Sequence, residues 1–385
     1  MDRLRGALGF VLILATAWLC CPPSLRRRVR PRTVIGGVLV LLLATLLVLK
    51  SPAAALFEGA DAAIKGLLGF VDEGSRFVFG DLARADGPAG AVFAFRVLPT
   101  VVFFAALVSV LYHLRILPFV VRWMGRGLSR ALGVSGAEAF STAADVFVGQ
   151  NEAPLAIRPY ISSLTRSELN ACMTAGFATT AGGVLAMYVQ MLDGLVPGIA
   201  GHLLACSVLC APASLVVAKL MLPETGEPVT GARVAPASPP GAANLVDAVV
   251  SGTLEGLRIA AYIGAMLIAF TALVAMIDAG LGRLGEAFGG EPGALSLGVI
   301  FGKLFWPLAW ATGVPSEDVE KTAALLGVKT SLNEFFAYTQ LSEALKADPA
   351  FLTPRGRLIV AYALCGFANF ASIGIQIGGY AALAP

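Results

Sequence analysis

Charged residues are scarce in this chain of 385 residues: Asp, Glu, Lys and Arg make up 14%, whereas 57% of residues are hydrophobic. A soluble domain carries roughly a quarter of its residues as charges, because its surface must stay hydrated. The net charge of +3 is too small to suggest a nucleic-acid partner. Histidine and cysteine are also few, with two and six copies, and none has the paired spacing of a zinc site. The composition therefore predicts an integral membrane protein.

Long apolar runs are present instead. A helix that crosses a bilayer needs about 20 mostly apolar residues. We predict such runs at Gly6–Leu25, Thr33–Leu49, Val97–Leu114, Leu169–Val196, Gly198–Ala218, Ile259–Leu281 and Leu358–Pro385. The arginines at 26–32 mark the first loop as cytoplasmic, which puts the N-terminus outside. Residues 53–80 are amphipathic and are expected to lie along the outer interface, and 222–243 read as a flexible cytoplasmic linker.

Two half-apolar regions, 134–164 and 314–345, carry too many polar residues to be ordinary spans. Each follows an amphipathic segment and precedes a span with a glycine-rich centre. Three predicted crossings separate the two regions, so the second enters the membrane from the opposite face. Re-entrant hairpins in inverted repeats, with tips that meet near the midplane, are typical of secondary transporters.

The predicted fold is therefore an all-α polytopic membrane protein with inverted repeats, two re-entrant helical hairpins and broken transmembrane helices. Four parts follow from this order: N-terminal spans and an interfacial helix at 1–117, a first repeat at 118–221, a cytoplasmic linker and a further span at 222–286, and a second repeat at 287–385.

A short polar motif lies at each predicted hairpin tip. Residues 150–152 read Gln-Asn-Glu and 333–334 read Asn-Glu, and each is followed later by Gly-Phe-Ala and a polar residue, at 176–179 and 366–369. An ionisable group at membrane depth costs a few kcal/mol, so its presence indicates a function. By contrast, we expect Glu317, Asp318 and Glu320 to form a solvated face of the second hairpin.

The chemistry of the tip residues indicates the kind of ligand. The carboxylates of Glu152 and Glu334 accept two hydrogen bonds side by side, which suits a vicinal diol or an amide-imide edge. The amides of Gln150 and Asn151 offer both donors and acceptors, as the edge of a nucleobase requires. The predicted ligand is small, polar and partly flat, with hydroxyl groups, which is the description of a nucleoside.

Asp145 lies five residues before the first tip motif, and Thr179-Thr180 lie in the broken helix that follows. A carboxylate, a hydroxyl and freed backbone carbonyls form an oxygen cage that suits a small cation. Two alternatives remain open at this point: a buried carboxylate can carry a proton instead, and the aspartate can simply cap a helix.

Three stretches, 149–160, 331–338 and 365–374, resemble the concentrative nucleoside transporter family, and the resemblance extends over nearly the whole chain. The resemblance implies a multi-pass protein of the bacterial inner (plasma) membrane that takes up nucleosides by symport with Na⁺, or alternatively H⁺. It also implies a homotrimer, in which 1–117 and 222–286 supply the scaffold and the two repeats form a transport domain with an elevator-like movement. No enzymatic activity and no cofactor besides the coupling ion are expected.

The family's site residues map onto positions of this sequence. The resemblance implies that the first tip and a nearby valine bind the base, through Gln150, Asn151, Glu152 and Val184. It implies that the second tip and its broken helix bind the ribose, through Glu334, Asn369 and Ser372, and that Phe367 lines the base pocket. The implied sodium ligands are Asp145, Val148, Thr179 and Thr180, with Val148 and Thr180 acting through their carbonyls.

Three positions depart from the family pattern. Residue 151 is Asn where the family usually has Thr or Ser, and residue 145 is Asp where sodium-coupled members carry Asn. The sequence ends at Pro385, where family members continue into one more helix, so we expect a truncated second repeat. The alternative is an impaired or non-transporting nucleoside-binding paralogue. An intramembrane enzyme is less favoured, because no nucleophile and base recur in the repeated motifs.

Overall fold

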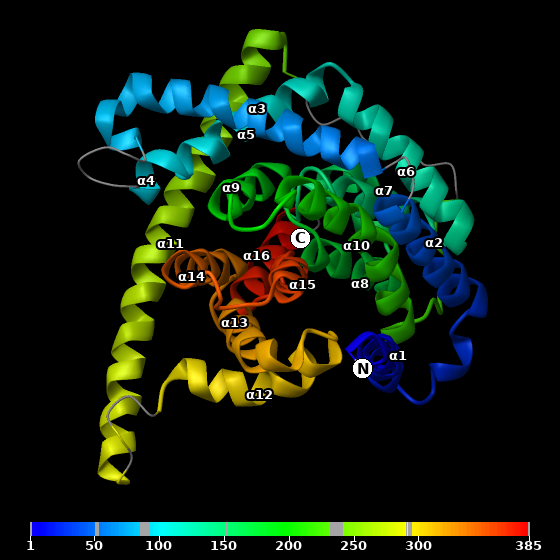
Figure 1. Ribbon diagram of the computed structural model, residues 1–385. Helices are drawn as coiled ribbons and strands as arrows, with labels where there is room; N and C mark the ends of the chain where they lie inside the picture. Colours follow the sequence, from blue (N-terminus) through cyan, green and yellow to red (C-terminus); the bar gives the residue numbers. More distant parts are fainter. Residues whose placement is uncertain are drawn as a thin grey trace.

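The computed structural model describes residues 2–50, 54–84, 92–150, 152–231, 242–289, 291 and 295–383, and these residues form helices and connecting loops without a β-strand (Figure 1). Before the first repeat come α1 (Asp2–Leu19), α2 (Pro31–Lys50), α3 (Ala54–Phe79) and α5 (Leu98–His113), with the short helices η1 (Arg26–Arg28), η2 (Gly80–Ala83) and α4 (Phe93–Arg96) between them. The all-α prediction is confirmed.

The predicted repeated order is present in the helices. The first repeat consists of α6 (Ile116–Leu132), α7 (Gly136–Asp145), η3 (Ala153–Ser163), α8 (Arg166–Ala178), α9 (Gly182–Leu192) and α10 (Ile199–Met221). After α11 (Leu245–Ala287), the second follows with α12 (Leu297–Ala311), η4 (Ser316–Asp318), α13 (Val319–Ser331), α14 (Glu334–Ala347), α15 (Pro354–Leu364) and α16 (Phe370–Leu383). Hairpin 1 is α7 with η3, and hairpin 2 is α13 with α14.

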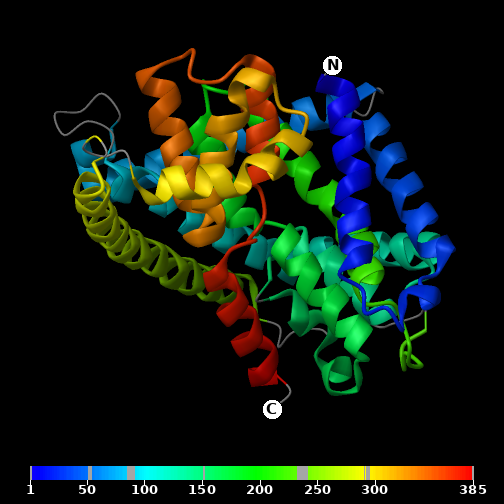
Figure 2. The ribbon, with the colours of Figure 1, turned by 90° about the horizontal axis from the view of Figure 1, so that it is seen from below.

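The two repeats interlock. In Figure 2, α13, α14 and α15 occupy one half of the molecule, while α16 reaches from them toward the half that holds hairpin 1. The second part of each broken helix packs against the other repeat: α9 contacts α14, and α16 contacts η3 and α8. This packing of α9 and α16 against the opposite repeat is typical of inverted repeats, and it brings both helix breaks to the middle of the molecule.

Local sequence signals start the helices of the first repeat. Ser135 accepts a hydrogen bond from the amide of Glu138, whose carboxylate in turn accepts from the amide of Ser135. Thr165 and Glu168 form the same reciprocal capping box at the start of α8. Each box satisfies amides that the first helical turn leaves without partners, so both helices begin at fixed residues.

Three of the seven predicted membrane spans correspond to described helical stretches that are long and apolar enough to cross a membrane: Ala94–His113, Arg166–Leu192 and Ile199–Met221. The span predicted at 259–281 lies within a longer helix of 43 residues, α11, which is about 65 Å long at 1.5 Å per residue. The helix runs along one edge of the molecule and is curved (Figures 1 and 2). Of the predicted linker, residues 232–241 lie outside the described residues.

The prediction that Glu317, Asp318 and Glu320 form a solvated face of hairpin 2 is wrong for Asp318. Glu317 and Glu320 are exposed, but Asp318 is 1% exposed. Its carboxylate accepts hydrogen bonds from the hydroxyl and the amide of Thr353, at 2.5 and 3.2 Å. Asp318 therefore fixes the base of hairpin 2 to the start of α15.

Two glycines allow α5 and α11 to pack closely. A Cβ atom on Gly252 would lie 2.7 Å from the Cα of Ala106, and one on Gly256 would lie 2.7 Å from the Cα of Val102. Glycines four residues apart on one helix face are a common way for membrane helices to approach one another. Gly280, farther along α11, has no atom within 4 Å of its ideal Cβ position.

The substitution Gly256→Val is therefore expected to destabilise the protein by about 1–3 kcal/mol, because overpacking separates α5 from α11. Gly280→Val on the same helix is the matched control and should behave as wild type. Thermal unfolding followed by size-exclusion chromatography of the detergent-solubilised protein measures the effect. Equal midpoints for the two variants would contradict this account of the packing.

Candidate functional site

The two broken helices cross at their breaks. The hydroxyl of Thr180, between α8 and α9, accepts a hydrogen bond of 2.9 Å from the amide of Gly366, between α15 and α16. The same oxygen lies 3.3 Å from the sulfur of Cys365. Gly366 has φ = +90°, and a Cβ there would lie 2.5 Å from the carbonyl oxygen of Ala178. Only glycine fits this crossing, which joins the two Gly-Phe-Ala motifs.

The tip of hairpin 1 packs onto the break between α8 and α9. The amide of Gly182 donates to the carbonyl of Phe147 at 2.9 Å. Gly149 has φ = +93°, and a Cβ on it would come within 2.7 Å of the Cβ of Ala181. Non-helical backbone is tolerated at membrane depth only where protein satisfies its polar groups, and each of these elements does so for the other.

A chain of hydrogen bonds joins the two hairpin tips. Glu334 is buried, and its two carboxylate oxygens accept from the hydroxyl of Tyr188 at 3.0 Å and from the amide of Asn369 at 2.8 Å. The side-chain oxygen of Asn369 accepts from the backbone amide of Ser372 at 2.8 Å. The hydroxyl of Ser372 accepts from the amide of Gln150 at 3.4 Å. Four of the predicted substrate residues are thus brought together from both repeats.

The repeated asparagines explain how the polar groups reach this place. Asn333 caps α14 by accepting a hydrogen bond from the amide of Phe336 at 2.8 Å. Glu334 is therefore the first residue of α14, where the partial positive charge of the helix N-terminus favours a carboxylate. Asn369 stands directly before α16 and caps its first turn through Ser372.

The remaining predicted substrate residues lie around this chain of hydrogen bonds. Val184 is buried on α9, and Phe367 is half-buried in the break between α15 and α16. Glu152 is half-buried directly before η3, and no hydrogen bond between described residues joins its side chain to Glu334 or Asn369. Asn151 lies outside the described residues.

The predicted cation ligands belong to hairpin 1 and to the first helix break, which meet where the amide of Gly182 donates to the carbonyl of Phe147. Asp145 is 1% exposed, and its Oδ1 atom has no hydrogen-bond partner among the described residues. Thr179 and Thr180 are fully buried. Within the described residues, no backbone amide outside the helices donates to the carbonyls of Val148 or Thr180. Asp145 ends α7 rather than starting a helix, so it is not an N-terminal cap. A carboxylate oxygen without a partner among the described residues and backbone carbonyls at a helix break are the kinds of ligand that suit a hard cation.

Sequence reasoning missed two polar residues of the site. Tyr188 donates to Glu334 and stacks on Tyr338 with ring centroids 4.3 Å apart. Gln376 is 1% exposed on α16, its amide donates to the carbonyl of Met173, and its Oε1 atom has no partner among the described residues. Each lies four residues after a predicted site residue on the same helix, Val184 and Ser372, which is the spacing that could have identified them.

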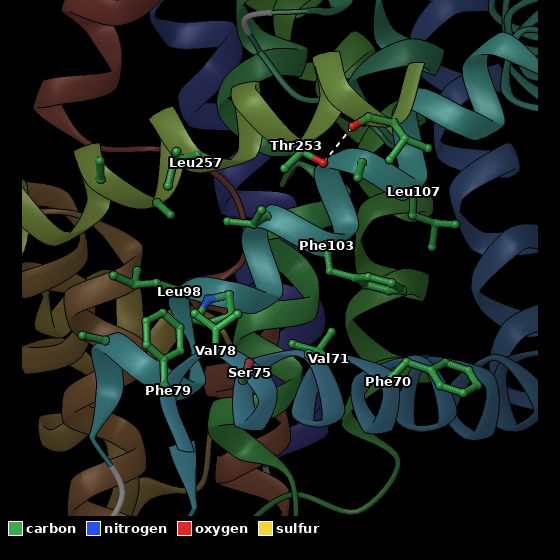
Figure 3. A pocket seen from close by; sticks show the side chains of 18 of the residues that line it. Phe70, Val71, Ser75, Val78, Phe79, Leu98, Phe103, Leu107, Thr253 and Leu257 are labelled. Atoms are coloured by element: carbon green, nitrogen blue, oxygen red, sulfur yellow. Dashed lines mark hydrogen bonds between the residues drawn. The ribbon is translucent and has the colours of Figure 1, made fainter. Parts of the chain in front are cut away.

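A large apolar hollow lies away from this chain of hydrogen bonds. It has a volume of about 700 Å³ between α3, α5 and α11 (Figure 3). Its polar side chains are Ser75 and Thr253, and the hydroxyl of Thr253 already donates to the carbonyl of Val249 at 2.7 Å. Nothing in its lining matches the polar groups of the predicted ligand.

Three family models match consecutive parts of the chain. Residues 8–82 match a model described as the Na⁺-dependent nucleoside transporter N-terminus, and residues 202–385 match the corresponding C-terminus. Residues 94–194, which hold hairpin 1 and the first helix break, match a model described as nucleoside recognition.

Whole-chain comparisons agree with these matches. An uncharacterized transporter of Haemophilus influenzae is 41% identical over 100% of this chain and 91% of its own length. The nucleoside permease NupC of Helicobacter pylori is 37% identical over 100% of this chain and 90% of its own. Human solute carrier family 28 member 3 is 38% identical over 93% of this chain and 52% of its own.

Solved structures show the same fold. CNTnw in an inward-facing substrate-bound state has a TM-score of 0.91 and 40% identity, over 100% of this chain and 90% of that one. A variant of CNTnw in an outward-facing state has the same TM-score, identity and coverage. The chain therefore belongs to the concentrative nucleoside transporter family, and it is a multi-pass membrane protein that transports nucleosides by symport with a cation rather than an enzyme.

Proposed function

We propose that this protein imports nucleosides across a bacterial inner membrane, and that the nucleoside binds between the tips of hairpin 1 and hairpin 2. The observation that carries this proposal is the hydrogen-bonded chain from Glu334 through Asn369 and Ser372 to Gln150. The bond between Gln150 and Ser372 crosses from one repeat to the other, so a ligand that binds along the whole chain contacts both repeats.

The ribose side of the nucleoside binds Glu334 and Asn369 in this proposal. A carboxylate at a helix N-terminus accepts hydrogen bonds from two neighbouring hydroxyl groups, and the vicinal diol of ribose supplies them. The hydroxyl of Tyr188, which donates to one carboxylate oxygen, holds Glu334 in the orientation that such binding requires.

The base side binds the tip of hairpin 1. The Oε1 atom of Gln150 is buried and has no partner among the described residues, so it is a free acceptor for an N–H group of a base. Asn151 and Glu152 extend the same polar edge, while Val184 and Phe367 supply apolar walls. Pairing with a polar edge discriminates between bases, because an unmatched buried donor or acceptor costs about 1–3 kcal/mol.

Sodium is the coupling ion that we propose, bound by Asp145, by the side chain of Thr179 and by the carbonyls of Val148 and Thr180. The unpartnered oxygen of Asp145 supports this assignment, and so does the sodium dependence named in two matching family models. The proton is the alternative, because the same carboxylate can carry one.

For the movement, we propose that the two repeats slide as one body past a scaffold made of 1–117 and 222–286, in a homotrimer. Two observations support it. The repeats interlock through α9 and α16, which makes them one packed unit. CNTnw, which shares this fold, has been solved in inward-facing and outward-facing states.

The first prediction for the site concerns Glu334→Gln. Loss of the carboxylate weakens two charge-assisted hydrogen bonds to ribose, each worth about 1.5–3 kcal/mol, so nucleoside affinity should fall at least tenfold. Glu343→Gln, an exposed position on the same helix, is the control. Uptake of radiolabelled uridine into proteoliposomes measures the effect, with membrane insertion checked in parallel. Undiminished uptake by the Glu334 variant would contradict the proposal that Glu334 binds the ribose.

The second prediction separates sodium from protons. An imposed sodium gradient should drive uridine uptake in the wild type and also in Asp145→Asn, because an amide oxygen can still ligate the ion. Asp145→Leu should abolish sodium-driven uptake. The opposite result, uptake driven by a proton gradient alone and lost in Asp145→Asn, would replace the sodium site by a proton carrier.

A further inference from the structure

Lys329 is a lysine inside the protein, 6% exposed, near the end of α13 in hairpin 2. Its ammonium group donates to the carbonyl of Ala363 at 3.0 Å and to the carbonyl of Cys365 at 2.9 Å. A charge in a protein interior is costly unless other groups compensate it. The position therefore indicates a specific role.

The two carbonyls explain why a cation is favourable here. They lie at the C-terminal end of α15, where the break at 365–369 removes the backbone amides that would otherwise donate hydrogen bonds to them. The end of a helix carries a partial negative charge, which attracts a cation. By binding these carbonyls, Lys329 fixes the break that leads into Asn369 and, through Asn369, the carboxylate of Glu334.

The first repeat has the same junction without a lysine. Alignment of Asn333-Glu334 with Asn151-Glu152 puts Phe147 at the position of Lys329. Where hairpin 1 meets its own helix break, the chain instead presents the carboxylate of Asp145 with an unpartnered oxygen. Each repeat thus has a negative environment between the first arm of its hairpin and its broken helix, and among the described residues only the second repeat places a cationic side chain there.

The charges of the two repeats differ accordingly. In the second repeat, the carboxylate of Glu334 and the ammonium of Lys329 attract each other. In the first, Asp145 and Glu152 repel each other, and no ion pair between described residues brings a lysine or arginine to Asp145. A single bound cation would give the first repeat the positive charge that the second already has.

We propose that the Lys329 ammonium is a built-in cation, which permanently does for hairpin 2 what the exchangeable coupling cation does for hairpin 1. This inference rests on the cation site proposed at Asp145. It means that the ribose side of the site is ordered without an ion, whereas the base side needs one. It also means that one exchangeable cation per chain suffices, because the second position is already occupied.

The test is equilibrium binding of radiolabelled uridine to the purified full-length protein over a series of sodium concentrations. Wild type should require sodium with a Hill coefficient near 1. Lys329→Ala should bind uridine about tenfold more weakly at the sodium concentration that half-saturates wild type. High sodium should restore binding with a Hill coefficient above 1, because a second ion enters the vacated position.

A small amine gives a readout that a purely structural lysine would not. Propylammonium should restore binding to Lys329→Ala, while tetramethylammonium at the same ionic strength should not, because it has no N–H to donate. Lys329→Met keeps most of the side-chain volume without the charge, so it should lose affinity and resist rescue. Lys346→Ala, at an exposed lysine on α14, is the control and should match wild type.

Two results would overturn the inference: wild-type affinity and sodium dependence in the Lys329 variants, or a loss in folded Lys329→Ala that neither sodium nor propylammonium reverses. If the alanine variant does not fold, the methionine variant decides, and affinity within twofold of wild type would overturn the proposal. If the affinity of the wild type for uridine changes with neither sodium concentration nor pH, the proposed coupling site itself is refuted. This measurement does not depend on the Lys329 variants.

Discussion

The crossing of the two broken helices, where the hydroxyl of Thr180 meets the amide of Gly366, is the constraint on which the rest of the site depends. Each break frees amides and carbonyls at membrane depth, and a freed group that is buried in protein is stabilised by a polar partner. Thr180 serves one amide, and Lys329 serves two carbonyls. The breaks are therefore stable only where the repeats lie against each other, and the proposed binding site lies at this contact.

In this site, the residues that start or cap helices are also the residues proposed to bind the nucleoside. Because α14 begins at Glu334 and α16 begins directly after Asn369, the residues that cap or start these helices are the ones that face the other repeat. Their geometry is set by backbone hydrogen bonds rather than by flexible side chains. Such a site is ordered before the nucleoside arrives, which lowers the cost of binding.

The sequence predicted the repeated order of helices and four residues that the structure joins by hydrogen bonds, because polar groups in apolar segments stand out. It could not predict the role of Asp318, since its partner Thr353 lies 35 residues away. Nor did it predict the length of α11, because Glu255 and Arg258 interrupt the hydropathy but not the helix. Lys329 was missed for a related reason: its carbonyl partners belong to α15 and its end, and only the fold brings them together.

The interlocked repeats also supply a physical route for coupling between ion and nucleoside. Tyr188 follows the first helix break on α9, yet it donates to Glu334 in the second repeat, and Gln150 of hairpin 1 donates to Ser372 of the second repeat. An ion that orders the first break therefore acts on groups of both half-sites. Linkage then requires the reverse effect, so a bound nucleoside tightens the ion by the same factor. Because Lys329 already orders the second break, all of this coupling passes through the first repeat, where a carboxylate oxygen of Asp145 has no partner among the described residues.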